Sequence, residues 1–340
     1  MRILLIKLKH IGDVLITTPT LRAIRDKYPH CRIVMLVRKG TEGILAGSPF
    51  VDEVFCTCPP EKHYRSGLLG WWEDLKILRR LRSEKFDYVF ELSDSDRGVV
   101  FAVLSGAAQK ITGGNGRNRP KLFTGSLFDR IVVSDWKNLH RVEKDHATVA
   151  PILDLPAEIP PLTFENYDAA ITPLPFPAGK YIFLHPATRW QRKKWPMDKW
   201  KTLLKTLATN TDYGFIISSG PDYEERKMAG ELAEMLGSRA FFTGGGLSWA
   251  RVALLMRGAV LFVGVDTAAM HLAAACGVPI AALFGPSKVS AWRPWQVRHV
   301  VVRPPGLEDC HLGKADVMRL MEQIEVEDVY QSIMLLTRSP

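Results

Sequence analysis

The sequence has few cysteines, and their arrangement is not that of a metal site. The 340 residues include five cysteines, an odd and scattered set. Cys56 and Cys58 are separated by one residue, and no cluster of histidine and cysteine partners lies beside them. Structural zinc sites have a different ligand spacing. We therefore expect reduced, structural cysteines and no metal site.

Long apolar runs are also absent. No apolar stretch reaches the roughly 18–20 residues that a membrane-spanning helix needs. Lys7 and Lys9 interrupt the first apolar run before the core of a signal peptide could form. The sequence therefore predicts a cytoplasmic protein.

The chain lacks the G-x-G-x-x-G fingerprint of dinucleotide-binding folds, because Gly12 stands alone in the first predicted strand-to-helix turn. This disfavours nicotinamide chemistry, and we expect no cofactor.

The chain carries an excess of positive charge, with a formal net charge of +9. Such a charge implies an anionic partner. Nucleic acid, anionic lipid and phosphorylated small molecules all satisfy this condition, and charge alone does not choose among them.

Apolar periodicity divides the chain into two halves with the same alternation of strands and helices. In the first half we expect strands at 3–8, 32–37, 53–57, 87–92 and 110–112, with helices at 14–27, 71–82, 99–104 and 142–155. In the second half we expect strands at 181–185, 215–218, 241–242, 260–264 and 279–284, with helices at 197–208, 224–236, 247–257 and 273–276.

This alternation predicts an α/β protein with parallel sheets covered by helices. A proline-rich stretch between positions 156 and 177 indicates the linker between the halves. We expect a first domain at 1–160, a second at 175–325 and a C-terminal helix at 326–340. The cleft between two such domains is the default active site.

The segment at 265–271 is the most informative about function. It follows a predicted buried strand and opens a helix, so Asp266, Thr267 and His271 stand where a strand ends and a helix begins. Ligands of open α/β sheets bind at this edge, and a helix N-terminus there favours phosphate. Alternatively, Asp266 or Thr267 caps the helix and His271 is a core histidine.

Two further loops carry charged groups at strand ends. In the first turn of the chain, Asp13 stands at a helix N-terminus, where it either caps the helix or takes a proton from an incoming hydroxyl. The loop at 186–196 contains four cations beside two tryptophans. It is either a solvated basic loop or a loop that binds a diphosphate through charge-assisted hydrogen bonds. Stacking on nucleic-acid bases is a third interpretation.

The remaining strand-end loops fit a nucleotide site as well. The carboxylates at 222–225 suit ribose hydroxyls, although they also suit the first turn of a helix. A run of three glycines at 244–246 lets the backbone approach a ligand closely. Each signal is weak alone, but together they indicate a nucleotide site opposite a carboxylate of the other domain.

Taken in order along the chain, these segments resemble the lipopolysaccharide heptosyltransferases, the ADP-heptose-dependent glycosyltransferases of the inverting GT-B class. The resemblance rests on Ile11-Gly12-Asp13 with Thr18-Pro19, His185-Pro186 with Lys193-Lys194-Trp195-Pro196, Gly220-Pro221, Val265-Asp266-Thr267 with His271, Leu283-Phe284-Gly285-Pro286, and Ala291-Trp292-Arg293-Pro294-Trp295. The last segment is most similar to the subgroup that adds the third, branching heptose of the inner core. The resemblance implies two Rossmann-like domains with parallel sheets facing a central cleft. The first domain would bind the acceptor and the second the nucleotide sugar.

The resemblance also implies roles for particular residues. Asp13 would be the catalytic base, and Lys193 would bind the diphosphate of the donor. The remaining expected substrate contacts are Gly12, Thr188, Arg189, Asp266, Thr267 and His271, with either Glu224 or Glu225 at the ribose.

The implied partners are an ADP-heptose donor and a heptosylated Kdo-lipid A acceptor, with no nucleic acid. The acceptor would place the protein in peripheral contact with the anionic inner membrane surface. Trp71, Trp72, Lys76, Arg79, Arg80, Arg82 and Lys85 fit a basic amphipathic helix for such a surface, or equally a helix packed on the sheet. Arg117, Arg119 and Lys121 are candidates for contacts with acceptor phosphates.

Two rival functions share parts of this pattern. A sugar-nucleotide epimerase of the same fold would use the nucleotide site and ignore any acceptor. A basic nucleic-acid-binding protein would show a steep salt dependence, but the sequence contains no recognisable helix-turn-helix or zinc finger in its support.

Overall fold

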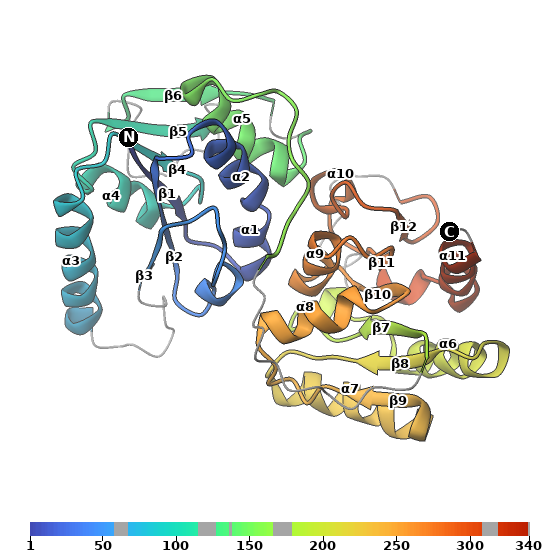
Figure 1. Ribbon diagram of the computed structural model, residues 1–340. Coiled ribbons are helices and arrows are strands. Elements are labelled where there is room, and N and C mark those ends of the chain that lie inside the picture. The colour runs from blue at the N-terminus through green and yellow to red at the C-terminus, as the bar shows by residue number, and fades with distance from the viewer. Residues whose placement is uncertain (58–66, 115–126, 136–137, 166–178, 308–318, 339–340) are drawn as a thin grey trace. The chain divides into compact units, whose positions relative to one another are not determined.

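A computed structural model describes residues 1–57, 67–114, 127–135, 138–165, 179–307 and 319–338 (Figure 1). The chain divides into two compact units, Met1–Asn166 and Tyr167–Pro340. Within the described residues, no helix is both long and apolar enough to cross a membrane.

The first unit contains a six-stranded parallel sheet in the order β3-β2-β1-β4-β5-β6. Its strands are β1 (Arg2–Lys7), β2 (Arg32–Arg38), β3 (Glu53–Thr57), β4 (Tyr88–Glu91), β5 (Gln109–Gly114) and β6 (Arg130–Val133). Its helices are α1 (Ile11–Leu15), α2 (Thr18–Lys27), α3 (Gly67–Ser83), α4 (Asp96–Leu104) and α5 (Arg141–Leu153), with a short 3-10 turn at Glu42–Ile44.

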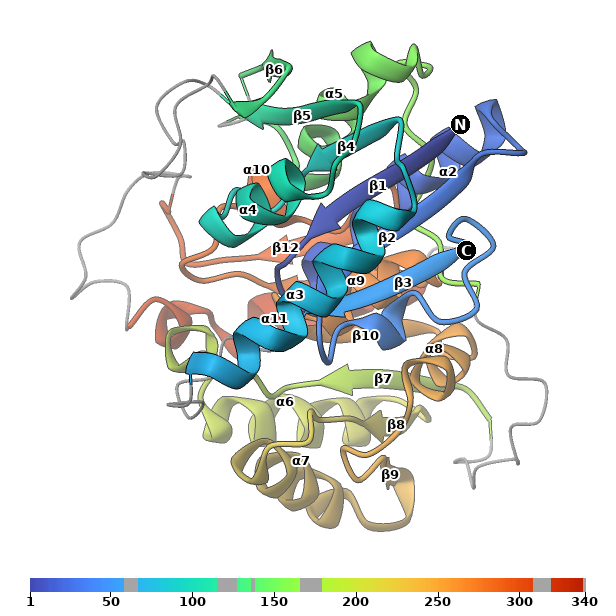
Figure 2. The same cartoon turned by 90° about the vertical axis from the view of Figure 1, so that its left-hand side faces the viewer.

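Helices α3 and α4 cover one face of this sheet (Figure 2). Leu78 and Leu81 of α3 and Phe101 of α4 are buried against Leu4 and Val34 of the central strands. The central strands are apolar on both faces, as expected of parallel strands covered by helices on both sides. Helices α2 and α5 contact each other, and α5 contacts β5 and β6.

The second unit contains a second six-stranded parallel sheet in the order β12-β11-β10-β7-β8-β9. Its strands are β7 (Tyr181–His185), β8 (Gly214–Ile217), β9 (Ala240–Phe242), β10 (Leu261–Val265), β11 (Ile280–Leu283) and β12 (His299–Val302). Its α-helices are α6 (Met197–Asn210), α7 (Tyr223–Leu236), α8 (Trp249–Arg257), α9 (Ala268–Ala275), α10 (Val289–Trp292) and α11 (Val326–Arg338). Short 3-10 turns lie at Gln191–Lys193, Gly237–Arg239 and Met321–Gln323.

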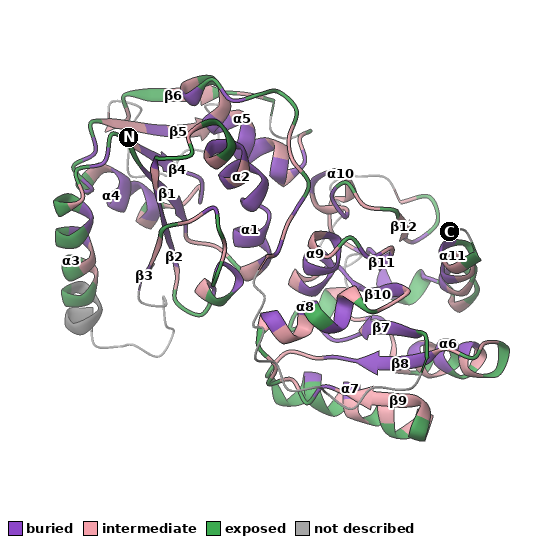
Figure 3. Ribbon diagram, viewed as in Figure 1, coloured by how far each residue is buried: buried purple, intermediate pink, exposed green. Residues whose placement is uncertain are grey.

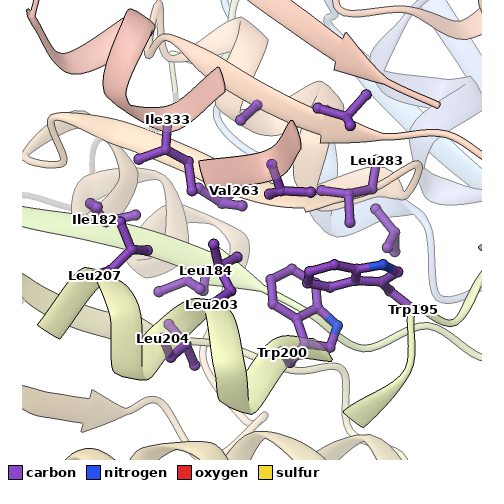
Figure 4. Close-up of a cluster of buried hydrophobic side chains, with 14 of the residues drawn as sticks. Ile182, Leu184, Trp195, Trp200, Leu203, Leu204, Leu207, Val263, Leu283 and Ile333 are labelled. Atoms are coloured by element: carbon purple, nitrogen blue, oxygen red, sulfur yellow. The ribbon is translucent and has the colours of Figure 1, made fainter. Parts of the chain in front are cut away.

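The core of the second unit lies between its sheet and helices α6, α7 and α11 (Figures 3 and 4). Trp195 and Trp200 meet edge to face with ring centroids 4.8 Å apart, and both side chains are buried. Ile333 of α11 belongs to the same apolar cluster, so the C-terminal helix is part of this core. On the opposite face, Phe183 and Phe262 stack on each other.

Both sheets have the same topology. Numbered from its own first strand, each reads 3-2-1-4-5-6, the order of the doubly wound Rossmann fold. The order in which strands are added to the sheet reverses between β1 and β4 in the first sheet and between β7 and β10 in the second. Ligands of such sheets bind at the carboxyl ends of the strands beside these switch points.

The structure corrects the sequence-based expectations at several places. The helix expected at 273–276 is α9, which begins at Ala268, and the short helix α10 was not expected. The expected helix at 14–27 is two helices, because Pro19 lacks an N–H and its ring opposes the carbonyl of Leu15 four residues earlier. Strands β6 and β12 were not expected at all. Each is a four-residue edge strand, and their residues are mostly half-buried or exposed.

Candidate active site

The switch point of the first unit carries Asp13. Strand β1 ends at Lys7, and Asp13 lies in the first turn of α1, where its side chain is half-buried and Gly12 is buried. Residue His10 precedes α1 as its N-cap, and among the described residues α1 has no side-chain cap. Asp13 therefore is not the residue that caps the helix, and its carboxylate stands at the strand-end edge.

A buried ion pair lies beneath this turn. The Lys7 ammonium is 2.7 Å from Oδ1 and 2.6 Å from Oδ2 of Asp145, which belongs to α5. The Thr17 hydroxyl is 2.9 Å from the same Oδ2 and 3.1 Å from the backbone oxygen of Asp13. Burial raises the pKa of Asp145, and the Lys7 charge opposes this shift.

The carboxyl end of β4 carries a second buried carboxyl group beside this pair. Glu91 is 2% exposed, and its oxygens accept hydrogen bonds from the backbone N–H groups of Ser93 and Asp94. Burial raises the pKa of Glu91 to about 7, and the neighbouring Asp94 adds to the shift. Asp94 itself pairs with Lys144 of α5.

In the second unit, Lys193 and Asp266 meet at the switch point. Lys193 ends a short 3-10 turn in the loop after β7, and Asp266 follows β10 directly. The Lys193 ammonium is 2.6 Å from Oδ2 of Asp266 and 3.3 Å from its backbone oxygen. The Lys193 side chain is 19% exposed, and both printed contacts of its ammonium are with Asp266. An ammonium has three donors.

The start of α9 beside this pair lacks the capping that the alternative interpretation required. Thr267 is the N-cap of α9 with extended backbone, and its side chain makes no cap hydrogen bond within the described part of the chain. Its Oγ1 is buried and has no hydrogen-bond partner among the described residues. Asp266 is paired with Lys193 rather than with the helix N-terminus. Backbone N–H groups of an eight-residue helix therefore open onto this edge.

His271 lies in the same helix, one turn further. It is 2% exposed, and its ring centroid is 6.1 Å from that of Trp292 in α10, with an interplanar angle of 53°. Helix α10 follows the carboxyl end of β11, the neighbour of β10, so Trp292 belongs to the same edge of the sheet.

The loop after β7 also carries His185, Thr188 and Arg189. The Ser218 hydroxyl donates to the Leu184 carbonyl at 3.1 Å, so the His185 Nδ1, 2.8 Å from that hydroxyl, is the donor to it. Burial lowers the pKa of His185 to about 4, which keeps the ring neutral. Thr188 is buried and accepts a hydrogen bond from the Trp190 backbone. Arg189 is exposed.

The structure distinguishes Glu224 from Glu225. Asp222 is the N-cap of α7, and Glu224 in the first turn is exposed. Glu225 is buried, and its Oε2 accepts a hydrogen bond of 2.9 Å from the Gly220 backbone at the end of β8. Burial raises the pKa of Glu225, and the charges of Arg189 and Lys194 oppose the shift. Glu225 therefore lies at the strand-end edge near the basic loop, and Glu224 faces solvent.

Some predicted site residues cannot be placed. Arg117, Arg119 and Lys121 lie outside the described residues, as does the side chain of Trp71. Of the others, the structure brings together Lys193, Asp266, Thr267, His271 and Glu225 at one edge of the second sheet. Asp13 and Gly12 occupy the corresponding edge of the first sheet. Among the described residues, no three histidine, cysteine or acidic side chains form a group that could hold a metal ion.

Sequence reasoning missed the partners beneath Asp13. It treated Lys7 only as a break in an apolar run, although a lysine closing a buried strand signals a buried partner. Nothing in the sequence points to Asp145, which is 138 positions away on another helix.

Comparison with known proteins decides the family. The model of "Glycosyltransferase family 9 (heptosyltransferase)" matches residues 75–318, more than half of the chain. The chain belongs to glycosyltransferase family 9.

This glycosyltransferase is similar to several curated proteins. It is 24% identical to lipopolysaccharide heptosyltransferase 3 of Escherichia coli over 294 residues, which cover 84% of this chain and 83% of that protein. It is 28% identical to lipopolysaccharide heptosyltransferase 1 of Escherichia coli K12 over 337 residues, which cover 95% of this chain and 100% of that protein.

Solved structures confirm the predicted GT-B fold. The Escherichia coli heptosyltransferase WaaC with ADP superimposes with a TM-score of 0.80 at 22% identity, covering 99% of this chain and 100% of that one. A family 9 glycosyltransferase from Veillonella parvula gives a TM-score of 0.79 at 20% identity, covering 99% and 97%. The expected family and fold class are therefore correct.

Proposed function

We propose that this glycosyltransferase moves heptose from ADP-L-glycero-D-manno-heptose to the inner core of lipopolysaccharide, with inversion at the anomeric carbon. The observation that carries the proposal is the partly exposed side chain of Lys193 beside the N-terminus of α9, whose N-cap Thr267 makes no side-chain cap hydrogen bond among the described residues. Both groups favour an anion such as a diphosphate. The similarity to proteins named lipopolysaccharide heptosyltransferase supports the choice of heptose and acceptor.

The second unit is the donor side of the reaction. Lys193 binds the diphosphate, and the α9 N–H groups with the Thr267 hydroxyl stabilise the negative charge that develops as the leaving group departs. Glu225, rather than the exposed Glu224, lies where a ribose hydroxyl would be held. We assign residues 175–325 to this role, and the C-terminal helix packs into the core of the same unit.

The first unit, residues 1–160, is the acceptor side. The Asp13 carboxylate removes the proton of an acceptor hydroxyl, whose oxygen bonds to the anomeric carbon as the bond from that carbon to the ADP oxygen breaks. The electron pair leaves with the ADP, and attack from the opposite face inverts the configuration. A heptosylated Kdo-lipid A is the acceptor, and the similarity to heptosyltransferase 3 favours transfer of the third, branching heptose.

Helix α3 is the proposed contact with the anionic inner membrane surface, on its cytoplasmic side. Its outward face carries Trp72, which is 56% exposed, followed by Leu75, Lys76 and Arg79 at helical spacing. Its inward face packs on the sheet through Leu78 and other leucines. An outward face with exposed apolar groups next to cations suits a lipid surface with anionic headgroups.

Thermal unfolding with millimolar ADP, UDP, GDP or NAD tests the donor assignment. A ligand at about 100 times its dissociation constant stabilises the native state by about 2.7 kcal/mol, which shifts the melting temperature measurably. We expect a shift with ADP and none with the other three. A shift with UDP alone would contradict the proposed donor, and no shift with any nucleotide would contradict nucleotide binding altogether.

A further inference from the structure

The ion pair at the end of β1 is deeply buried, and the proposed reaction does not use it. The side chains of Lys7 and Asp145 are 6% and 2% exposed. Both carboxylate oxygens of Asp145 contact the ammonium, at 2.7 and 2.6 Å. A buried pair of this kind contributes little net stability compared with apolar side chains of similar volume. Its role therefore has to be sought in what else it contacts.

Thr17 connects this pair to the turn that carries Asp13. Its side chain is fully buried, and its hydroxyl is within hydrogen-bonding distance of Asp145 Oδ2 at 2.9 Å and of the Asp13 backbone oxygen at 3.1 Å. The hydroxyl has one proton, and the shorter contact with a carboxylate oxygen makes Asp145 its main acceptor. The Thr17 N–H donates to the Val14 carbonyl at 3.2 Å. Asp145 therefore holds Thr17, and Thr17 holds the last turn of α1.

Helix α1 needs such support because it is short. It has five residues, too few to be stable by its own hydrogen bonds, and its N-cap His10 makes no side-chain cap within the described part of the chain. Asp145 comes from α5, which packs on α2 and on β5 and is thus fixed independently of this turn. Through Thr17, the pair connects this short helix to α5 and to the end of β1.

We propose that Asp145, held by the Lys7 ammonium, is a positioning residue that fixes the Asp13 turn through the Thr17 hydroxyl. The Lys7 charge opposes the effect of burial on the Asp145 pKa, the ammonium holds both carboxylate oxygens, and the carboxylate orients Thr17. Thr17 in turn sets where α1 ends and hence where Asp13 points. The inference deepens the proposed function and rests on it, since it concerns the placement of the proposed base.

A double variant separates this role from a contribution to stability. Lys7→Met with Asp145→Leu replaces the pair by apolar groups, which commonly leaves stability unchanged or higher. We expect a melting temperature and an ADP dissociation constant close to those of the unmodified protein, with kcat for heptose transfer lower by about 100-fold, the scale of a small misplacement of a catalytic group.

Thr17 provides a second test that does not depend on the folding of the double variant. Thr17→Val removes the hydroxyl and keeps the shape, and Thr17→Ser keeps the hydroxyl; we expect kcat to fall in the first and to recover in the second. Thr148→Val is the matched control, because Thr148 is buried on α5 and its hydroxyl donates to a carbonyl four residues earlier, that of Lys144. We expect kcat in this control to be unchanged.

The outcomes distinguish failure of the positioning role from failure of the proposed function. A folded double variant or Thr17→Val variant with unmodified kcat would overturn the positioning role alone, as would an equal loss in Thr148→Val. Absence of both ADP binding and transfer in the unmodified protein would overturn the proposed function, and this inference with it.

Discussion

The two units share one strand order, yet they differ in how a lysine at or after the end of the first strand is used. In the first unit Lys7 and Asp145 are buried away from solvent, with side chains 6% and 2% exposed. In the second unit the Lys193 side chain, paired with Asp266, is 19% exposed. Both pairs have a shortest separation of 2.6 Å.

This difference in burial gives the two lysines different roles: one holds neighbouring residues in place, and the other can bind a ligand. The Lys7 ammonium, in a side chain only 6% exposed, directs two hydrogen bonds to Asp145 and is shielded from ligands in solution. Asp145 in turn contacts Thr17 beside the turn with Asp13. The Lys193 side chain is more exposed, and its ammonium has a third donor for an incoming anion. Duplication of one topology therefore yields an edge that positions a proposed base and an edge that receives a proposed diphosphate.

The largest expected effect is a loss of turnover caused by a substitution in the first unit. Asp13→Ala removes the proposed base, and we expect turnover to fall by about 100-fold or more, while calorimetric titration gives an ADP affinity equal to that of the unmodified protein. Asp26→Ala is the control, because Asp26 is an exposed aspartate on α2. Near-normal turnover of Asp13→Ala would remove Asp13 from the role.

The next largest effect is a loss of ADP affinity caused by a substitution in the second unit. Lys193→Ala removes the ammonium and leaves the Asp266 carboxylate to repel the diphosphate, so we expect ADP to bind about 30-fold more weakly, the equivalent of roughly 2 kcal/mol for a charged hydrogen bond. Lys201→Ala on α6, whose side chain is 42% exposed, is the control. Unchanged ADP affinity in Lys193→Ala would refute the diphosphate assignment.

The proposed membrane contact predicts that charge reversal on α3 of the first unit weakens vesicle binding, whereas charge reversal on α7 of the second unit does not. We expect Lys76→Glu with Arg79→Glu on α3 to weaken binding to vesicles that contain anionic lipid, by about fivefold for each cation removed. Lys227→Glu on the exposed face of α7 makes the same type of charge reversal in the second unit and is expected to have no effect. Equal binding of both variants would contradict a role for α3.

Arg80 is deliberately left unchanged in that experiment. Its guanidinium is 2.6 Å from Glu53 and lies over the ring of Phe55, 4.7 Å from the centroid. A charge reversal there would disturb packing on β3 as well as the outward charge.

The smallest effect is a difference in pH dependence. Glu91 has a pKa raised to about 7, so the native first unit binds more protons than the unfolded chain between about pH 4.5 and 7, and its stability falls as pH rises. His185 has a pKa lowered to about 4, so it makes the stability of the second unit rise with pH between about 4 and 6.5. Each slope is at most about 1.4 kcal/mol per pH unit.

Hydrogen exchange resolves the two slopes by element. After correction for intrinsic exchange rates, we expect protection of β4 to fall and protection of β7 to rise with pH in these ranges. Glu91→Gln should flatten the profile of β4 and leave that of β7 unchanged. A flattened β7 profile or an unaltered β4 profile would contradict the assignment of these shifts to separate units.

The sequence was sufficient for the buried strands and for the loops that follow them. Central strands such as β1, β7 and β10 are buried on both faces and therefore read as continuous apolar runs. Edge strands β6 and β12 are four residues long and largely half-exposed, so they carry no such signal. The central strands locate the loops that follow them, and the motifs in these loops were sufficient to predict the family and the fold class.

The sequence was not sufficient for contacts between distant segments. Residues Glu224 and Glu225 are neighbours in the chain, and only the phase of α7 turns one inward to Gly220 and the other to solvent. Asp145 reaches Lys7 from another helix, a contact that local patterns do not encode. The site roles of Asp13, Lys193 and Asp266 stay predictions until the variants are measured.

The most direct test of the account is the release of ADP from ADP-heptose by the unmodified protein, with and without heptosylated Kdo-lipid A. The account predicts release that requires the acceptor, in a one-to-one ratio with a heptosylated product of inverted anomeric configuration. Equal release without the acceptor, or turnover of a UDP-sugar in place of ADP-heptose, would contradict it.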